Sequence, residues 1–259
     1  MKRLPLSLVL RTLLLITLLF VQVVSVFAQG QGSVGRALRF DGVDDYVEVS
    51  HVQAYGNVQS EAFTIRAHFV INALTPEKSQ VIIRKSHDQQ DVDTWRLEIT
   101  DQGEVVFFLK DIHSGYSEYS GVGFEVAGTD VTLWSDAGAV RAGEWVAISA
   151  VYDDNSAGEG VRLYVNGVLV REMVPMRPTG NIPQGRSAQS TGSIWMGEGL
   201  YGEIDQIAWY SRAFLPAEGE LGDGDLDALT DALGIWCFEE RDETVKDDVV
   251  QTSNHGTLF

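Results

Sequence analysis

Apolar and polar residues alternate with a period of two along much of the chain. Residues 62–71 place five apolar side chains on one face, and residues 94–99 repeat the pattern, with Trp95 and Leu97 opposite Arg96. Successive side chains of a β-strand point to opposite faces, whereas a helix would repeat every three to four residues. The alternation therefore predicts half-buried strands.

Further strands are indicated by other apolar segments. Residues 104–110 and 144–153 are apolar at nearly every position, which is typical of strands covered on both faces. Shorter strand patterns occupy residues 192–197 and 203–210. In total the pattern predicts about ten strands, and no helix before Pro216. Many short strands separated by turn residues predict an all-β fold, a sandwich or barrel of antiparallel sheet.

The strongest local signal is a hairpin. The Asn-Gly dipeptide at 166–167 stands between two alternating runs. Asn-Gly favours a type I′ turn, which requires positive φ at both central positions. Such a turn would pair Val165 with Val168 and, further out, Leu163 with Val170.

The first residues follow a different pattern. Three basic residues precede a mostly apolar run over residues 13–27, which ends in small residues. This order is typical of a secretory signal peptide, here 1–28, cleaved after Ala28. An uncleaved anchor is the alternative, although a membrane span needs about 20 apolar residues. We expect a secreted protein, extracellular or periplasmic, with no stable membrane insertion after cleavage.

Net charge excludes some classes of partner. The chain has 19 Lys and Arg against 37 Asp and Glu, and losing the three basic leader residues takes the net charge from −18 to −21. Nucleic acids and anionic membranes bind clustered Lys and Arg, so we expect neither as a partner. The lone cysteine, Cys237, stands between Trp236 and Phe238 and predicts a buried free thiol.

Five segments resemble laminin-G-like jelly-roll domains of the concanavalin A-like lectin and glucanase superfamily. In chain order they are Gly35–Val49 (GRALRFDGVDDYVEV), residues 63–70 (FTIRAHFV), 143–153 (GEWVAISAVYD), 161–170 (VRLYVNGVLV) and 201–218 (YGEIDQIAWYSRAFLPAE). The resemblance implies two antiparallel sheets packed face to face in a jelly-roll sandwich. It also implies secreted or surface proteins that bind sugars or proteins and often carry calcium. This fold hosts many functions, so the ligand must be argued from the site.

The end of the chain, Gly234–Phe259, resembles the stretch with which members of this family commonly open, although its loop "EERDETVKDD" departs from the usual wording. Only residues 29–35 separate the expected cleavage site from the first strand, at 36–40. We therefore predict a circularly shifted jelly roll, in which Gly234–Glu239 folds back as an added strand near residues 36–40. The predicted segments after the leader are the jelly-roll domain 29–218, an acidic connector 219–233 and the completing C-terminal strand segment 234–259.

Candidate metal ligands are Asp41, Asp44 and Asp205, and the expected cofactor is calcium, which prefers carboxylate oxygens. On an unbroken strand Asp205 shares a face with Ile207 and Trp209, so it would be a buried carboxylate in need of strong partners or a metal. The resemblance implies that the first and last strands are neighbours, which would bring Asp41 or Asp44 toward Asp205. The alternatives are backbone amide partners for Asp205 and a simple tight turn for the other acids.

Candidate ligand-binding residues lie in and after the long loop 111–121. Carbohydrate sites combine aromatic faces with polar neighbours, and the residues of this kind are His113, Tyr116, Glu118, Tyr119 and Trp134. The alternative is that these aromatic side chains pack the loop against the body. The tryptophans expected in the core are Trp95, Trp145, Trp195 and Trp209. The polar side chains expected on outer strand faces are Arg66, His68, Arg96 and Glu98.

The strand at 203–210 matches part of a glycosidase motif. Laminarinase-type glucanases of the same superfamily carry a Glu-x-Asp-x-(x)-Glu strand; Glu203 and Asp205 match its first two acids, but the third falls on Ile207 or Ala208. A retaining enzyme needs two carboxylates about 5–5.5 Å apart, so we predict no enzyme. We expect a secreted recognition or adhesion domain that binds carbohydrate or an extracellular protein surface, assisted by calcium. The alternatives are an assembly module without a small ligand and, less favoured, a glycan-active enzyme.

Overall fold

Seventeen strands make up the regular structure of the described residues of this computed structural model. These residues belong to the structural unit Arg36–Phe259, so the predicted leader lies outside them. None of the described segments is a helix long and apolar enough to cross a membrane. The described ranges are 36–51, 62–86, 93–110, 117–128, 130–153, 160–173, 192–214, 232–238, 244–245 and 255–259.

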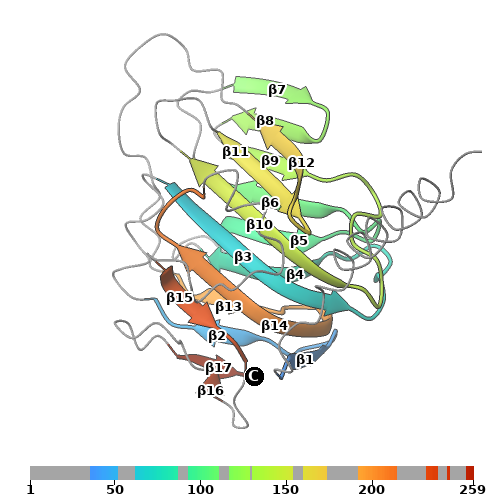
Figure 1. Ribbon diagram of the computed structural model, residues 1–259, viewed down its shortest axis with the longest axis vertical. Helices are drawn as coiled ribbons and strands as arrows, with labels where there is room; N and C mark the ends of the chain where they lie inside the picture. Colours follow the sequence, from blue (N-terminus) through green and yellow to red (C-terminus); the bar gives the residue numbers. More distant parts are fainter. Residues whose placement is uncertain are drawn as a thin grey trace, which may run out of the picture. The chain divides into compact units, whose positions relative to one another are not determined.

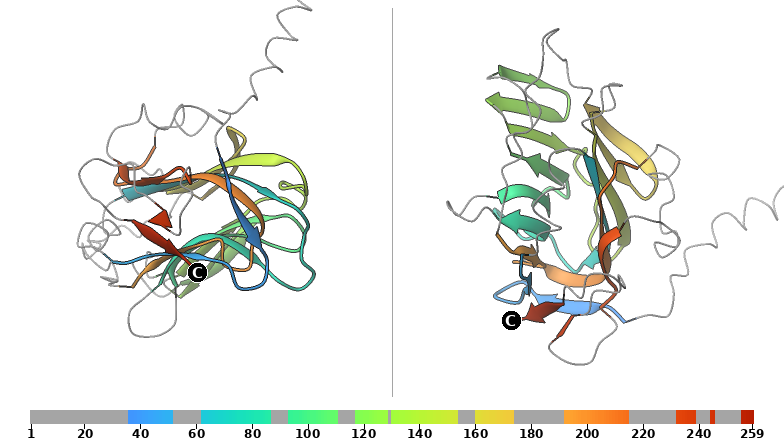
Figure 2. Two further views of the ribbon diagram at one scale, coloured as in Figure 1. Left: turned by 90° about the horizontal axis from the view of Figure 1, so that it is seen from below. Right: turned by 90° about the vertical axis from the view of Figure 1, so that its left-hand side faces the viewer.

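The strands form two antiparallel sheets, which Figure 2 shows as separate layers. The seven-stranded sheet contains, in spatial order, β1 (Leu38–Asp41), β14 (Tyr201–Tyr210), β3 (Ala62–Ile71), β10 (Trp145–Asp153), β11 (Val161–Val165) and β12 (Val168–Met173), with β15 (Ala232–Trp236) also paired to β14 (Figure 1). The ten-stranded sheet contains β16 (Thr244–Val245), β17 (Gly256–Leu258), β2 (Val47–Val49), β13 (Ile194–Met196), β4 (Gln80–Ser86), β5 (Asp93–Ile99), β6 (Val105–Leu109), β9 (Asp130–Trp134), β8 (Phe124–Gly128) and β7 (Ser117–Gly121). The predicted all-β jelly-roll sandwich is confirmed.

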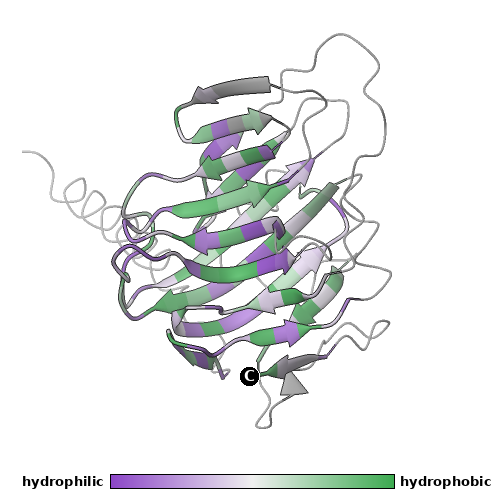
Figure 3. Cartoon of the chain, turned by 180° about the vertical axis from the view of Figure 1, so that it is seen from behind, coloured by the Kyte–Doolittle hydropathy of each residue, from purple (hydrophilic) through white to green (hydrophobic). Residues whose placement is uncertain are grey.

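The core lies between the sheets and is built from the inward residues of the alternating pattern. Hydrophobic and hydrophilic positions alternate along the strands in Figure 3. Phe63, Trp95 and Trp209 form an aromatic centre, with the ring centroids of the two tryptophans 5.2 Å apart. Complete burial of a large apolar side chain stabilises the fold by about 1.5–3 kcal/mol relative to exposure. These residues therefore hold the two layers face to face.

The predicted hairpin between β11 and β12 is confirmed, but its register shifts. Asn166 and Gly167 both have positive φ, 50° and 75°, as a type I′ turn requires. Val165 pairs with Val168 as predicted. A bulge after Leu163 then pairs this residue with Arg171 and not with Val170. The prediction for the outer pair was wrong because a bulge adds one residue on one strand, which the turn sequence does not encode.

The C-terminal segment folds back into the same sandwich, as predicted. β15 lies along β14, with Trp236 opposite Ile207, and β1 continues along the same edge of β14, with Leu38 opposite Ile204. Both strands are antiparallel to β14, so β15 and β1 follow one another in the same direction. In the other sheet β17 pairs with β2. Trp236 is completely buried in the main core, so this segment is an integral part of the fold.

Two of the four tryptophans expected in the core lie elsewhere. Trp95 and Trp209 are buried, but Trp195 is half-buried on the outer face of the ten-stranded sheet, and Trp145 is 43% exposed. Along β10 the main core takes Val146 and its alternate neighbours, which turns Trp145 outward. The run 144–153 is apolar on both faces, so the sequence could not show which face meets the core.

A smaller apolar cluster explains why β10 is apolar on both sides. It forms on the outer face of the seven-stranded sheet, and its buried members are Val151, Tyr164, Ala208, Tyr210, Phe214 and Ile235. Cys237 has a free thiol, is half-buried and packs against this smaller cluster, not in the main core as expected. Its Sγ accepts a hydrogen bond from Gln206 Nε2 at 3.2 Å.

Candidate functional site

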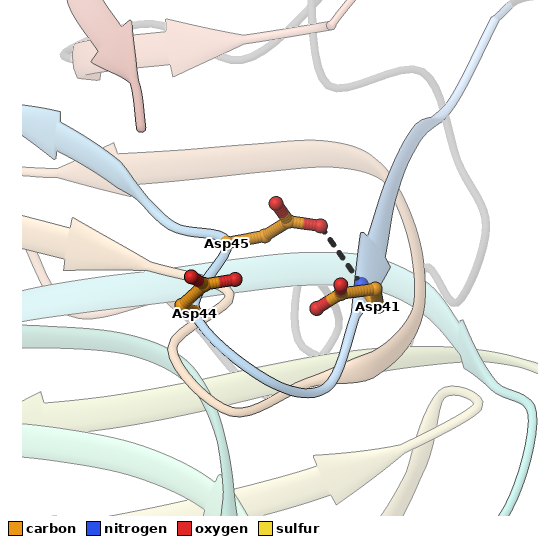
Figure 4. A group of neighbouring side chains, drawn as sticks. All are labelled: Asp41, Asp44 and Asp45. Carbon is orange, nitrogen blue, oxygen red and sulfur yellow. Dashed lines mark hydrogen bonds between the residues drawn. The ribbon is translucent and has the colours of Figure 1, made fainter.

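The acidic turn between β1 and β2 brings three carboxylates together. One ligand oxygen from each of Asp41, Asp44 and Asp45 lies within 4.8 Å of the others. Two of these side chains also build the turn, because Asp41 Oδ1 accepts a hydrogen bond from Val43 N at 2.8 Å and Asp45 Oδ2 accepts one from Asp41 N at 2.9 Å. Figure 4 shows the three carboxylates around the loop. The turn thus has a structural role of its own.

Gly42 allows this turn to lie close to β14. Its φ is +82°, a conformation that favours glycine, and a Cβ added there would approach the Cβ of Tyr201 to 2.9 Å. Tyr201 is the first residue of β14 and pairs with Asp41. The glycine therefore fixes the acidic turn beside the start of β14.

The acidic turn has the right chemistry for calcium. Calcium binds carboxylate oxygens at 2.3–2.6 Å, so two ligand oxygens on one ion lie up to about 5 Å apart. The three carboxylates meet that spacing. Of the three candidate ligands named from the sequence, the group contains Asp41 and Asp44 but not Asp205, and its third member is Asp45.

Asp205 lies on the outer face of the seven-stranded sheet and not at the acidic turn. The register of β14 against β3 shifts between Ile204 and Gln206, so Asp205 is the extra residue of a bulge. Ile204 and Ile207 both remain in the core on either side of it. The bulge changes the phase of the strand, so Asp205 no longer shares a face with Ile207 as an unbroken strand would require.

The partner of Asp205 is a histidine. His68 Nδ1 lies 3.0 Å from Asp205 Oδ2, and the two side chains are 16% and 28% exposed. The ring of His68 also contacts Trp145, with centroids 4.9 Å apart and planes at 38°. A carboxylate thus holds a histidine against a tryptophan whose side chain is open to solvent. His68 was predicted to lie on an outer face, and its position is confirmed.

Further polar side chains surround this group. Across the outer face, Arg39 of β1 pairs with Glu203 of β14, Glu203 with Val70 of β3, and Val70 with Trp145 of β10. Tyr201, 39% exposed, lies two residues from Glu203 on the same strand face. We call this group the outer-face patch, and its members are His68, Trp145, Tyr201, Glu203 and Asp205.

The outer-face patch contains part of the glucanase-like motif, and its setting bears on catalysis. Glu203 and Asp205 are both accessible, but Ile207 and Ala208, at the position of the third acid, are completely buried in apolar clusters. A carboxylate at either position would point into a core. The strand therefore offers no place for the missing acid/base.

The opposite outer face carries an ion-pair network across β4 and β5. Arg84 donates to Glu198 Oε2 at 2.6 Å and to Asp93 Oδ1 at 2.9 Å, and Arg96 donates to Asp93 Oδ2 at 2.7 Å. Arg84 also lies over the ring of Trp195, 4.9 Å from its centroid.

The pKa of Arg84 lies above its ordinary value. Burial alone would lower the pKa, but the hydrogen bonds and charges of Glu198 and Asp93 outweigh it. All the side chains of this network pair with one another or stack, so we assign it to sheet stability.

Most of the predicted loop site lies outside the described residues. His113 and Tyr116 fall in residues 111–116, and Glu118 and Tyr119 are described only as backbone of β7. Trp134 is half-buried at the end of β9, where it pairs with Val106. The candidate that the sequence missed is Trp145, because the run 144–153 is apolar on both faces and gives no signal of which face meets the core.

Comparisons with known proteins define the class. The two-sheet antiparallel sandwich is a jelly roll, and residues 41–218 match the model of the Laminin_G_3 family, described as the concanavalin A-like lectin/glucanases superfamily. The match spans more than half of the chain, and the chain belongs to this family. A search of curated proteins finds no match.

Solved structures with the same fold include three from different organisms. A candidate carbohydrate-binding protein from Bacteroides ovatus is 14% identical, with a TM-score of 0.54; the match covers 86% of this chain and 58% of that one. The CBM40 module of the Ruminococcus gnavus IT-sialidase, bound to α2,3-sialyllactose, is 15% identical, with a TM-score of 0.48. The match covers 73% of this chain and 97% of that one. A Trypanosoma rangeli sialidase bound to 2,3-difluorosialic acid is 12% identical, with a TM-score of 0.46. The match covers 75% of this chain and 28% of that one. At these identities the similarity shows the fold alone.

Proposed function

We propose that this protein is a secreted, non-catalytic recognition domain that binds carbohydrate through the outer-face patch. The observation that carries the proposal is Trp145, a 43% exposed tryptophan that contacts His68, itself paired with Asp205. An exposed indole face stacks on the apolar face of a sugar ring, while neighbouring polar groups bind its hydroxyls. An exposed tryptophan on a solvent-facing strand leaves apolar surface in water, which is unfavourable unless a ligand covers it.

Three further points support this proposal. The chain belongs to a family whose description names lectins. The Bacteroides ovatus protein of the same fold is named for carbohydrate binding. The patch also supplies both donors and acceptors, since Tyr201 carries a hydroxyl and Glu203 a carboxylate within the same surface.

Secretion and calcium are part of the proposal. The basic and apolar leader at 1–28 supports export, and the cluster of Asp41, Asp44 and Asp45 supports a calcium ion beside the patch. Such an ion would hold the acidic turn against Tyr201 and screen the repulsion among the three carboxylates. The proposed role is binding without cleavage, because Ile207 and Ala208 leave the strand without a third acid.

A glycan array followed by titration calorimetry tests the proposal. We expect saturable binding of at least one glycan by the mature protein, and a loss of tenfold or more in affinity for Trp145→Ala. Phe259→Ala is the matched control, because Phe259 is an exposed aromatic residue of the other sheet, at 56% exposure. Equal affinity of the two variants for every bound glycan would exclude the outer-face patch as the binding site. Release of reducing sugar would contradict the non-catalytic role.

Assembly is the second candidate function, and one observation favours it. On β12, the outermost strand of the described seven-stranded sheet, Val168 and Leu169 are 63% and 43% exposed. Edge strands with exposed apolar residues favour pairing with another chain. Sedimentation analysis at rising protein concentration decides this point, since a monomer throughout would exclude assembly through β12.

A further inference from the structure

The charge around Trp145 points to one chemical class of sugar. Two carboxylates of the outer-face patch, from Glu203 and Asp205, lie on this side of the seven-stranded sheet, and the acidic turn beside it keeps one net negative charge when Asp41, Asp44 and Asp45 hold the proposed calcium ion. The exposed cation of the same row is Arg39, opposite Glu203. Negative charge therefore dominates the surface that a ligand stacked on Trp145 would face.

The remaining charged groups near the patch do not change its sign. The turn before β10 adds one charge of each sign, Arg141 and Glu144. Arg66 lies next along the outer face of β3, but it is only 3% exposed. His68 Nδ1 is paired with Asp205 Oδ2 at 3.0 Å. A ligand at Trp145 thus meets an excess of carboxylate over guanidinium.

The spacing suits a cation beside a stacked ring. Glu203 and Trp145 occupy the same row on strands two apart, so their Cα atoms are separated by about 10 Å, twice the distance between neighbouring strands. Val70, which lies between them, is 7% exposed, so its side chain does not project between Trp145 and Glu203. A sugar ring resting on Trp145 would therefore present its substituents toward Glu203 and Asp205.

We propose that the outer-face patch selects glycans that carry a protonated primary amine, such as glucosamine oligomers, over N-acetylated or unsubstituted sugars. An ammonium group gains twice here, since an indole face attracts a cation and a carboxylate pairs with it. Acetylation removes the charge and adds bulk, and a hydroxyl offers only a neutral hydrogen bond. This inference rests on the proposed carbohydrate-binding function of the same patch and names its substrate class.

Three matched ligands test the selection by calorimetry. They are β-1,4-linked oligomers of glucosamine, of N-acetylglucosamine and of glucose, which have the same linkage and differ at one substituent. We expect the glucosamine oligomer to bind about tenfold more tightly than either of the others at low salt. That advantage falls as salt is raised, because salt screens partly exposed charges.

Charge-neutral variants locate the effect. Glu203→Gln and Asp205→Asn keep the shape of each side chain, and the asparagine still accepts the hydrogen bond from His68. We expect each to remove most of the preference for the amine, measured as the ratio of the affinities for the glucosamine and N-acetylglucosamine oligomers within the same variant. Asp136→Asn, at a 92% exposed carboxylate outside the patch, is the control and should keep the full preference.

The outcomes separate this inference from the proposed function. Equal binding of all three oligomers, abolished by Trp145→Ala, would overturn the amine selection and leave carbohydrate binding at the patch intact. Amine binding that survives Trp145→Ala and both neutral variants would reflect general attraction to an acidic protein and would also overturn it. If none of the oligomers binds, the selection is excluded, and the glycan array decides the proposed function by itself.

Discussion

At the residue scale, the positions that matter most are those whose direction the sequence leaves open. Trp145 belongs to a run that is apolar on both faces, so its exposure follows only from the packing of β10. Asp205 faces outward because a bulge shifts the phase of β14. A bulge depends on how two strands fit together, and the residue types of β14 do not predict one. Asp41 and Asp44, by contrast, could be placed in one turn from the local sequence alone.

Gly42 and Gly138 form a matched pair for a stability test. Both have positive φ, +82° and +75°, but a Cβ at Gly42 would meet Tyr201 whereas one at Gly138 would meet open space. Gly138→Ala should cost about 1 kcal/mol in free energy of unfolding from the backbone alone, and Gly42→Ala should cost at least about 1 kcal/mol more. Urea denaturation of both variants measures the difference. Equal losses would mean that the close approach to Tyr201 adds no strain.

Calcium binding predicts a shift of the melting temperature. An ion held only by the folded state at a free concentration of about 100 times its Kd adds about 2.7 kcal/mol to the free energy of unfolding. We expect calcium to raise the Tm of the protein, EDTA to reverse the rise, and Asp44→Asn to abolish it. An unchanged Tm on adding calcium would exclude a calcium ion bound at the acidic turn.

At the scale of elements, most of the strands could be read from the period-two pattern and the Asn-Gly turn, because both signals are local. The pairing partners could not, since pairing joins residues far apart in the chain. The return of the C-terminal segment as a strand of the same sandwich was predicted from the order of family-like segments and is confirmed, whereas its pairing with β14 was not predicted. The small outer cluster of the seven-stranded sheet had no signal in the sequence beyond the unbroken apolar run of β10.

The contribution of β15 can be measured at Trp236. Its side chain is completely buried in the main core, so Trp236→Ala should lower the free energy of unfolding by about 3–5 kcal/mol. Phe259→Ala, at an exposed aromatic residue of the same C-terminal segment, should cost less than about 1 kcal/mol. Chemical denaturation of both variants tests this. Similar small losses would show that β15 is dispensable to the core.

At the scale of the described unit, the sandwich separates two kinds of surface. On the outer face of the ten-stranded sheet, Arg84 and Arg96 both pair with Asp93. The outer face of the seven-stranded sheet exposes an aromatic ring beside carboxylates. A face whose groups are already paired offers little to a ligand, whereas a partly open aromatic and polar surface offers both stacking and hydrogen bonds. The functional account therefore rests on the seven-stranded sheet.

The most direct test follows the tryptophan indole N–H signals by NMR while a glycan identified on the array is added. Our account predicts that the signal of Trp145, assigned from Trp145→Phe, shifts and saturates with the glycan, while those of buried Trp95 and Trp209 stay in place. A shift confined to Trp134 or Trp195, on the other sheet, with Trp145 unmoved, would contradict it.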